Sequence, residues 1–392
     1  MARTQTSAQV SAQIVTSTNT PLHGLKVVEL ARVLAGPWVG QTLADLGADV
    51  IKVESPEGDG TREWGPPYIT REDGTEESAY YHSCNRGKRG VVADFRNADD
   101  VAFVKRLCAD ADVVIENFKV DGLAKFGLDY ASLTADNPRL VYCSITGYGQ
   151  DGPYAKQPGY DFVIQGMSGF MSLTGQADGE PMKHGLSISD LSCGLYSVIA
   201  IQSALLMRER TGTGQHIDMA LLDCSVALLA NQSLSYLATG NNPPRMGNAH
   251  AQVAPYQVYE LADGHFILAT GNDRQFQRLC TVLGRADLAQ DERLESNAGR
   301  IEHRDWMNAE IAKEVKRFTK ADMLRQCEAS NIPVGPINTL DEVFADPQVK
   351  ARGMQIELPG GVPSVRSPFT FSDAELALGR ASPKHGEHQD EV

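Results

Sequence analysis

The sequence lacks the long apolar segments that mark membrane and secreted proteins. No run of 18 or more apolar residues occurs among the 392 residues, so no segment is predicted to span a membrane. The first 20 residues are rich in Ser, Thr and Gln, lack the apolar core of a secretory signal, and contain a single arginine, Arg3. We therefore predict a flexible N-terminal tail over residues 1–21.

Cysteine is sparse, and its spacing suggests no cross-links. The seven cysteines are odd in number, and the closest two in sequence, Cys84 and Cys108, lie 24 positions apart with no C-x-x-C pair. This spacing favours neither a disulfide framework nor a zinc site, and it is typical of reduced thiols in the cytoplasm. His385 and His388 near the C-terminus could hold a metal, but histidines on a polar chain end are usually solvated, so no metal is expected.

Positive charge is scarce, and several nucleotide and hydrolase motifs are absent. The formal net charge is −14, which argues against nucleic acid or an anionic membrane as a partner. No G-x-G-x-x-G follows a predicted strand, and there is no P-loop, H-E-x-x-H or G-x-S-x-G sequence. The glycines of Thr211–Gln215 follow a helix and are too weak a signal to use. The sequence therefore lacks the usual motifs of enzymes that transfer hydride or hydrolyse NTPs, of zinc-dependent hydrolases and of serine hydrolases.

Short apolar strands alternate with helical segments in the first part of the chain. Examples are the strand at Leu25–Leu30, the helix at Gly36–Gly47 and the strand at Ala48–Ser55. This alternation predicts an α/β fold with a parallel sheet covered on both faces, and ligands bind such sheets at the carboxyl ends of the strands. The chain of 392 residues is longer than a single hydrophobic core normally supports, so two domains are expected. We predict a large Rossmann-like domain over 22–224, a smaller α+β domain over 225–331, and a return segment with a polar tail over 332–392.

A basic segment stands out in this acidic protein. Residues 85–96 contain Arg86, Lys88, Arg89 and Arg96 against one acid, and Lys125 follows the next strand. A solvated surface loop is one interpretation. A local site for a phosphorylated ligand is the other, because Arg and Lys hold polyanions well. Charge alone does not decide between them.

Asp190 begins a long apolar segment that is predicted to be helical. Aspartate is a preferred N-cap, since its carboxylate accepts hydrogen bonds from the free amides of the first turn. From this segment alone a cap is favoured over a catalytic role.

Six ordered blocks of sequence resemble the class III coenzyme A transferases, a family that includes formyl-CoA transferase, carnitine CoA-transferase and the α-methylacyl-CoA racemases. The resemblance runs from Leu22 to Met354, and it is carried by residues 24–54, 85–95, 111–118, 137–154, 159–169 and 211–223. It implies an interlocked homodimer in which each chain has a large Rossmann-like domain and a smaller inserted domain. It also implies that CoA and acyl-CoA are substrates, with no tightly bound cofactor.

The resemblance assigns site residues by position. The nucleophile is expected at Asp190, about thirty residues after Tyr160 and Asp161, which would orient substrate. The CoA contacts are expected at Val33, Ala35, Ala93, Arg96, Asn117, Phe118 and Lys125, with Arg86, Lys88 and Arg89 as further phosphate-binding cations. Lys125 and Ser55 stand where formyl-CoA transferase has arginines.

Departures from individual members narrow the expected reaction. The loop over residues 245–258 is similar to the succinyl-CoA:dicarboxylate branch rather than to formyl-CoA transferase. We expect CoA transfer from an acyl-CoA, such as succinyl-CoA, to a short carboxylic or dicarboxylic acid. A racemase is an alternative, but no histidine occurs between His82 and His184, so one of its two bases is missing. A non-catalytic CoA-binding protein is a third possibility, against which Asp190 argues.

Overall fold

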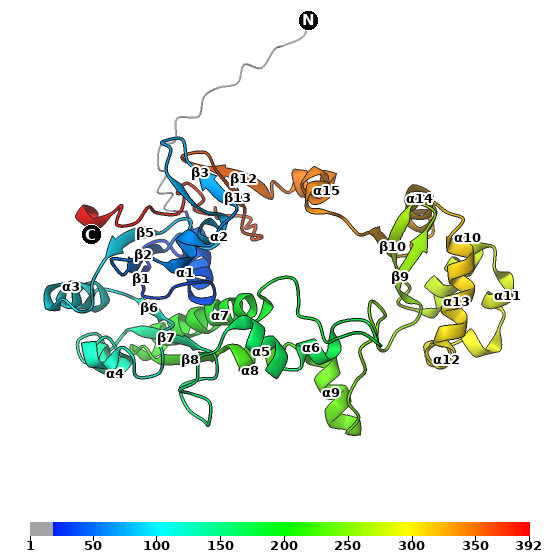
Figure 1. Ribbon diagram of the computed structural model, residues 1–392, viewed down its shortest axis with the longest axis horizontal. Helices are drawn as coiled ribbons and strands as arrows, with labels where there is room; N and C mark the ends of the chain where they lie inside the picture. Colours follow the sequence, from blue (N-terminus) through cyan, green and yellow to red (C-terminus); the bar gives the residue numbers. More distant parts are fainter. Residues whose placement is uncertain (1–18) are drawn as a thin grey trace, which may run out of the picture. The chain divides into compact units, whose positions relative to one another are not determined.

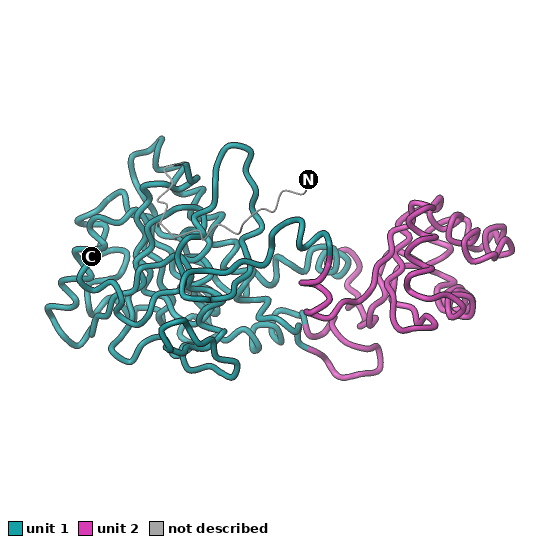
Figure 2. The backbone as a smooth tube through the Cα atoms, turned by 90° about the horizontal axis from the view of Figure 1, so that it is seen from above, with its two compact units in different colours: residues 1–170, 183–237, 347–392 teal, residues 171–182, 238–346 magenta. Residues whose placement is uncertain are grey.

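The computed structural model describes residues 19–392. Most of the predicted N-terminal tail, residues 1–18, lies outside the described residues. The end of the predicted tail is packed: the carbonyl of Asn19 accepts the amide of Glu375 at 3.0 Å, and Thr20 is buried. The chain divides into two compact units, coloured separately in Figure 2. The larger comprises residues 1–170, 183–237 and 347–392, and the smaller comprises residues 171–182 and 238–346.

A six-stranded, all-parallel sheet forms the centre of the larger unit. Its strand order is β5-β2-β1-β6-β7-β8. Alternate residues of β6 face opposite cores, Val113 and Ile115 toward one and Val114 toward the other, which explains the continuous apolar runs. The predicted parallel α/β architecture is confirmed. The strands are β1 (Lys26–Glu29), β2 (Asp49–Glu54), β5 (Arg89–Val92), β6 (Val113–Glu116), β7 (Val141–Thr146) and β8 (His216–Ala220).

Helices cover both faces of this sheet (Figure 1). One face packs against α1, α7 and α8, and the other packs against α3 and α4. Two small hairpins, β3–β4 and β12–β13, complete the larger unit, while α6 and α9 continue from it into the smaller one. The helices are α1 (Ala35–Asp45), α2 (Ala79–Ser83), α3 (Ala98–Ala109), α4 (Tyr130–Thr134), α5 (Asp161–Met167), α6 (Phe170–Leu173), α7 (Ile188–Thr211), α8 (Leu221–Ala227), α9 (Ala230–Thr239) and α16 (Pro347–Ala351). The hairpin strands are β3 (Tyr68–Thr70), β4 (Glu76–Ser78), β12 (Gln355–Leu358) and β13 (Val362–Val365).

Helix α7 lies unusually close to α1. A Cβ at Gly194 would lie 3.0 Å from the ring of Trp38 and 3.1 Å from the carbonyl oxygen of Ala35, so a larger residue would require its neighbours to shift by a few tenths of an ångström. By length and composition alone α7 could cross a membrane. It nevertheless packs through Cys193, Val198 and Ile201 against the core of the larger unit. The close contact fixes the first turn of α7, which carries Asp190, beside the loop between β1 and α1.

The C-terminal residues pack along the edge strand β5, where a solvated tail was predicted. His388 donates its amide to the carbonyl of Gly90 at 2.9 Å, and its Nδ1 accepts the amide of Gly90 at 3.1 Å. Val92 donates its amide to the side-chain oxygen of Gln389 at 2.7 Å. The prediction of solvated histidines is corrected here for His388, because the open edge of β5 offers unpaired backbone groups that the tail satisfies.

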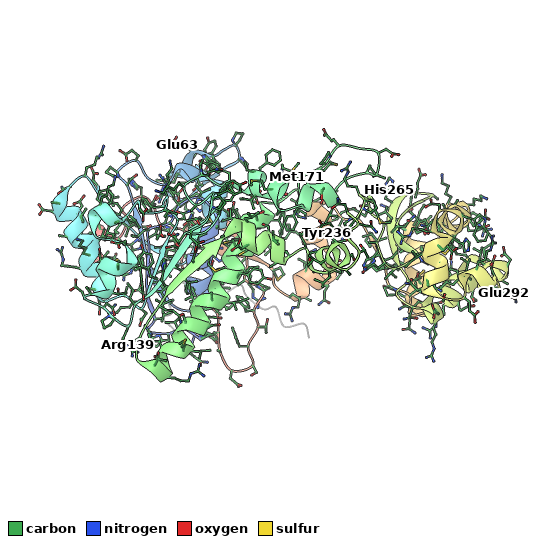
Figure 3. The ribbon with its side chains drawn as sticks, turned by 90° about the horizontal axis from the view of Figure 1, so that it is seen from below. Glu63, Arg139, Met171, Tyr236, His265 and Glu292 are labelled. Carbon is green, nitrogen blue, oxygen red and sulfur yellow. The ribbon has the colours of Figure 1, made fainter. Side chains whose placement is uncertain are left out.

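The smaller unit has its own core. A three-stranded antiparallel sheet of order β11-β10-β9 packs through Phe266 and Leu268 against Phe276 of α10 and Ile311 of α13. Figure 3 labels His265 on β10 and Glu292 within this unit. Its elements are β9 (Tyr256–Leu261), β10 (Gly264–Ala269), α10 (Asp273–Leu283), α11 (Ala286–Ala289), α12 (Asn297–Glu302), α13 (Arg304–Val315), α14 (Lys320–Ala329), β11 (Val334–Pro336) and α15 (Leu340–Ala345).

The observed units have different bounds from the predicted domains. Residues 334–336 were predicted to lie in the return segment, yet they pair with β10 as β11. Residues 225–237 were predicted to lie in the smaller domain, yet they belong to the larger unit. The first difference arises from the pairing of β11 with β10, which the local composition does not encode.

Candidate active site

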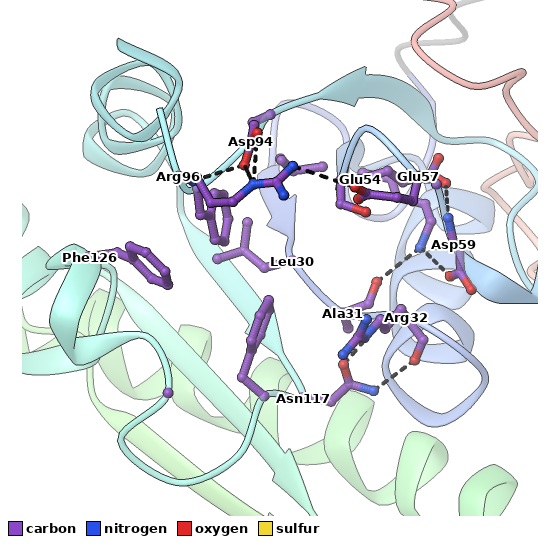
Figure 4. A pocket seen from close by; sticks show the side chains of 18 of the residues that line it. Leu30, Ala31, Arg32, Glu54, Glu57, Asp59, Asp94, Arg96, Asn117 and Phe126 are labelled. Carbon is purple, nitrogen blue, oxygen red and sulfur yellow. Dashed lines mark hydrogen bonds and ion pairs between the residues drawn. The ribbon is translucent and has the colours of Figure 1, made fainter. Parts of the chain in front are cut away.

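A cavity of about 530 Å³ opens at the carboxyl ends of β1, β2, β5 and β6. Predicted CoA contacts line it: Ala93 and Arg96 after β5, Asn117 and Phe118 after β6, and Lys125 farther along the same loop. Figure 4 shows this cavity, which we name the first cavity. Four predicted loops that are distant in sequence therefore meet at one edge of the sheet, as parallel topology requires.

A second cavity, of about 210 Å³, lies beside the first. Val33, Ala35, Tyr160, Asp161 and Asp190 line it. The two cavities share four residues, namely Arg32, Asn117, Phe118 and Lys119. They therefore adjoin each other across a shared wall, and we call the two together the groove. Predicted CoA-binding residues line both cavities, and the predicted nucleophile lies in the second.

The shared wall of the groove is held by a reciprocal pair of hydrogen bonds. The amide of Arg32 donates to the side-chain oxygen of Asn117 at 3.1 Å, and the side-chain amide of Asn117 donates to the carbonyl of Arg32 at 2.7 Å. The Arg32 guanidinium lies 5.9 Å from the centre of the Phe118 ring. Asn117 therefore ties the loop after β1 to the loop after β6, and it leaves the side chain of Arg32 exposed at the junction.

The first cavity contains exposed cations. The side chain of Arg96 is 76% exposed, and its Nε lies 2.8 Å from Asp94. Lys119 and Lys125 are also exposed, with the ammonium of Lys125 4.7 Å from the centre of the Phe126 ring. These groups can bind a multiply phosphorylated ligand without first leaving a buried ion pair.

Arg86, Lys88 and Arg89 do not line either cavity of the groove. Lys88 is fully buried and donates to Glu29 at 2.9 Å, and Arg86 is buried and donates to Asp45 at 2.8 Å. Arg89 donates to Asp49 at 2.9 Å. The phosphate role predicted for these three cations is corrected by this placement, because Arg86 and Lys88 are paired with buried carboxylates and Arg89 is paired with Asp49 away from both cavities. Neither predicted interpretation, solvated loop or phosphate site, describes Arg86 and Lys88.

Asp161 caps helix α7, and Asp190 does not. The Asp161 carboxylate accepts the amides of Ser189 at 2.8 Å and Asp190 at 3.4 Å. Its other oxygen accepts the side-chain amide of Gln165 at 2.7 Å. Because Asp161 occupies the free amides of the first turn, the carboxylate of Asp190 is left to face the second cavity.

Burial and a neighbouring charge perturb Asp190. Burial and, to a smaller extent, the nearby carboxylate of Asp161 together raise the pKa of Asp190 to about 7. No hydrogen bond to the Asp190 carboxylate is found within residues 19–392. A desolvated, unpaired carboxylate next to a cavity is an arrangement that favours chemistry over stability.

Three residues that support this site were not predicted from the sequence. Gln165 is fully buried and links Asp161 to the amide of His184 at 2.8 Å. Lys52 and Asp59 line the first cavity and form a buried ion pair at 3.0 Å. A lysine within the apolar strand β2, and a glutamine four residues after an aspartate on one helix, were the available signals.

Comparisons with known proteins agree with this geometry. The sequence matches CoA-transferase family III over residues 22–389. It is 56% identical to a succinate–glutarate CoA-transferase of Agrobacterium fabrum, covering 95% of this chain and 94% of that protein. It is 38% identical to the human succinyl-CoA:glutarate CoA-transferase, covering 94% of this chain and 84% of that protein.

A solved structure has the same fold. A CAIB/BAIF family protein from Brucella suis superposes with a TM-score of 0.87 at 60% identity, covering 95% of this chain and 98% of that one. The chain belongs to CoA-transferase family III and is a CoA-transferase, as the resemblance in sequence implies. Within the described residues no cluster of His, Cys, Asp or Glu is arranged to hold a metal ion.

Proposed function

We propose that this enzyme transfers CoA between succinyl-CoA and a short dicarboxylic acid of the glutarate type, with Asp190 as the nucleophile. The observation that carries the proposal is the pair of adjoining cavities, with exposed cations in the first and the unpaired carboxylate of Asp190 in the second. The acids are inferred from the names of the relatives, which include succinate–glutarate and succinyl-CoA:mesaconate CoA-transferases.

The two cavities suit the two parts of acyl-CoA. Arg96, Lys119 and Lys125 would bind the phosphates of the nucleotide in the first cavity. The chain that carries the thioester would cross the shared wall at Asn117 and Phe118. The thioester carbonyl would then lie next to Asp190 in the second cavity.

The reaction runs through two anhydrides. The carboxylate of Asp190 attacks the succinyl carbonyl, forms a mixed anhydride and releases CoA as its thiolate. The thiolate attacks the Asp190 carbonyl, releases succinate and leaves an aspartyl-CoA thioester. The acceptor carboxylate attacks the carbonyl of this thioester, forms a second mixed anhydride with Asp190 and releases the thiolate again. The thiolate finally attacks the acceptor carbonyl, forms the new acyl-CoA and restores the carboxylate of Asp190.

The surroundings of Asp190 suit this role. A carboxylate without hydrogen bonds is more nucleophilic than one held by donors, and partial burial keeps water from the intermediates. Asp161, the first residue of α5, binds the amides of Ser189 and Asp190 and would thereby orient the Asp190 side chain. Tyr160, 67% exposed at the rim of the second cavity, would contact the acyl group.

Racemisation is disfavoured by the composition of the second cavity. The residues that line it include aspartates but no histidine, so one of the two bases that a racemase needs is missing. A non-catalytic CoA-binding role is likewise disfavoured, because the chain belongs to a family of transferases.

We also propose that the enzyme is an interlocked homodimer with a smaller inserted domain. The outer side of α7 exposes Leu195, Ile199 and Leu206, the last at 70%, which is unusual for three large apolar side chains on one helix. A second copy of the chain would cover this surface. The seven buried free thiols suit a reducing compartment, so the cytoplasm is the proposed location.

Trapping the intermediates tests the proposal. The purified enzyme is incubated with succinyl-CoA and hydroxylamine, and the modified peptide is identified by mass spectrometry. A hydroxamate at Asp190 is expected, with none when CoA replaces succinyl-CoA. A panel of acceptor acids, with both products followed, then identifies the acceptor. Modification of another carboxylate, with Asp190 intact, would refute the assignment.

A further inference from the structure

Val33 has a strained backbone at the edge of the groove. Its φ angle is 71°, in the left-handed region, where a β-branched residue is a genuine outlier. Val33 lies in the loop between β1 and α1 and lines the second cavity. Strain of this kind persists only where surrounding contacts fix the conformation, and it is concentrated at functional sites.

Asp59 is the contact that fixes Val33. The amide of Val33 donates to the Asp59 carboxylate, 3.2 Å from Oδ2 and 3.4 Å from Oδ1. Oδ1 also accepts the amide of Thr61 at 3.0 Å and its hydroxyl at 2.8 Å. The carboxylate is buried, so each of these bonds is shielded from water.

Lys52 fixes Asp59 and the loop together. Its fully buried ammonium donates to Asp59 Oδ2 at 3.0 Å, to the carbonyl of Ala31 at 2.9 Å and to Glu29 at 3.2 Å. Figure 4 labels Ala31 and Asp59 and marks the interactions at both residues with dashed lines. Lys52 therefore holds the residue two positions before Val33, and Asp59 holds Val33 itself.

We propose that the Lys52–Asp59 pair is a positioning device that keeps residues 31–35 in the strained conformation that binds CoA. The proposal rests on the proposed CoA site. It accounts for an acidic residue in the wall of a cavity that takes a polyanion. Lys52 neutralises the charge of Asp59, and the carboxylate serves the backbone of Val33 rather than the ligand.

The effect that we expect of Asp59→Asn on CoA binding is opposite to the effect that charge alone predicts. Asp59→Asn removes a negative charge near the phosphates, which by charge alone would tighten CoA binding. We expect it instead to raise the Kd for CoA about tenfold, because an amide cannot accept all four of the hydrogen bonds that the carboxylate accepts. Glu57→Gln is the matched control, because Glu57 lines the same cavity but does not contact Val33. The Kd of this variant for CoA should equal the wild-type value or be lower.

Rescue by glycine separates positioning from general stability. Glycine adopts a φ of 71° without strain, so Val33→Gly should restore CoA affinity in the Asp59→Asn background to within about threefold of Val33→Gly alone. Val33→Ala removes the same side chain but keeps a Cβ, so it should give little rescue. A merely structural role for Asp59 would make the effects of the variants additive.

Calorimetric titration with CoA, together with the melting temperature of each variant, measures these effects in the full chain. Equal affinity of Asp59→Asn and wild type, or no rescue by glycine, would overturn the inference. If Asp59→Asn does not fold, Asp59→Glu keeps the charge but displaces the carboxylate from Val33, and the same rescue is expected. Failure of the wild-type protein to bind CoA would instead reject the proposed function.

Discussion

The two ends of the groove use charge in opposite ways. The first cavity presents solvated cations such as Arg96, whose side chain is 76% exposed and whose electrostatic interactions are therefore screened by water and salt. The second cavity contains two neighbouring carboxylates, and burial raises the pKa of Asp190 to about 7. The first end is suited to affinity and the second to reactivity, so changes at the two ends should affect different kinetic constants.

Removal of the nucleophile should have the largest effect. Asp190→Ala is expected to lower kcat by about 10⁴-fold or more, because the other carboxylate of the second cavity, Asp161, is already held by Gln165 and by the amides of the first turn of α7. The Kd for CoA should change by less than about threefold, since the cations of the first cavity are intact. Steady-state kinetics and calorimetry measure the two quantities. Wild-type turnover would remove Asp190 from the mechanism.

Removal of the cations should affect binding alone. Arg96→Ala and Lys125→Ala are each expected to raise the KM for acyl-CoA about tenfold at low salt and less at 0.5 M salt, with kcat nearly unchanged. Arg89→Ala is the matched control, because its guanidinium is paired with Asp49 and does not line either cavity. A larger effect of Arg89→Ala than of Arg96→Ala would reverse the assignment of the two groups.

The pH dependence should report the pair of carboxylates. Since Asp190 must be ionised to attack, kcat/KM should rise with pH through about 7. Asp161→Asn removes the neighbouring negative charge that raises the pKa of Asp190, so the rise should move to lower pH. The conservative amide can still accept the amides of the first turn through its oxygen. An unchanged profile would show that another group titrates.

The same group should reduce stability. The folded-state pKa of Asp190 is above the ordinary value of about 3.9, so the protonated form is favoured by folding and stability falls as pH rises from about 4 to above 7. Asp190→Asn should therefore raise the free energy of unfolding by about 1–3 kcal/mol at pH 8 and by little at pH 4. Denaturant titrations at both pH values test this. Ser197→Ala, which removes a buried hydroxyl of α7 but no charge, is the control, and its effect on the free energy of unfolding should be the same at both pH values.

The sequence by itself indicated a parallel α/β fold, five of the six strands of its sheet and the family, whereas β8 and the order of the strands in the sheet came from the structure. The apolar runs of β1, β2, β6 and β7 are buried on both faces, so hydrophobicity alone marks them. The resemblance to the family indicated Asp190, Arg96, Asn117 and Phe118, and all four residues line one or both of the two cavities.

Only the tertiary structure decided what each charge does. Arg96 and Lys88 look alike in sequence, yet one is exposed in a cavity and the other is buried against Glu29. Two aspartates compete for the first turn of α7, and the packing of α5 gives the cap to Asp161 and leaves Asp190 unpaired. A charge acquires its role from its partners and its solvent exposure, and both depend on residues that are distant in sequence.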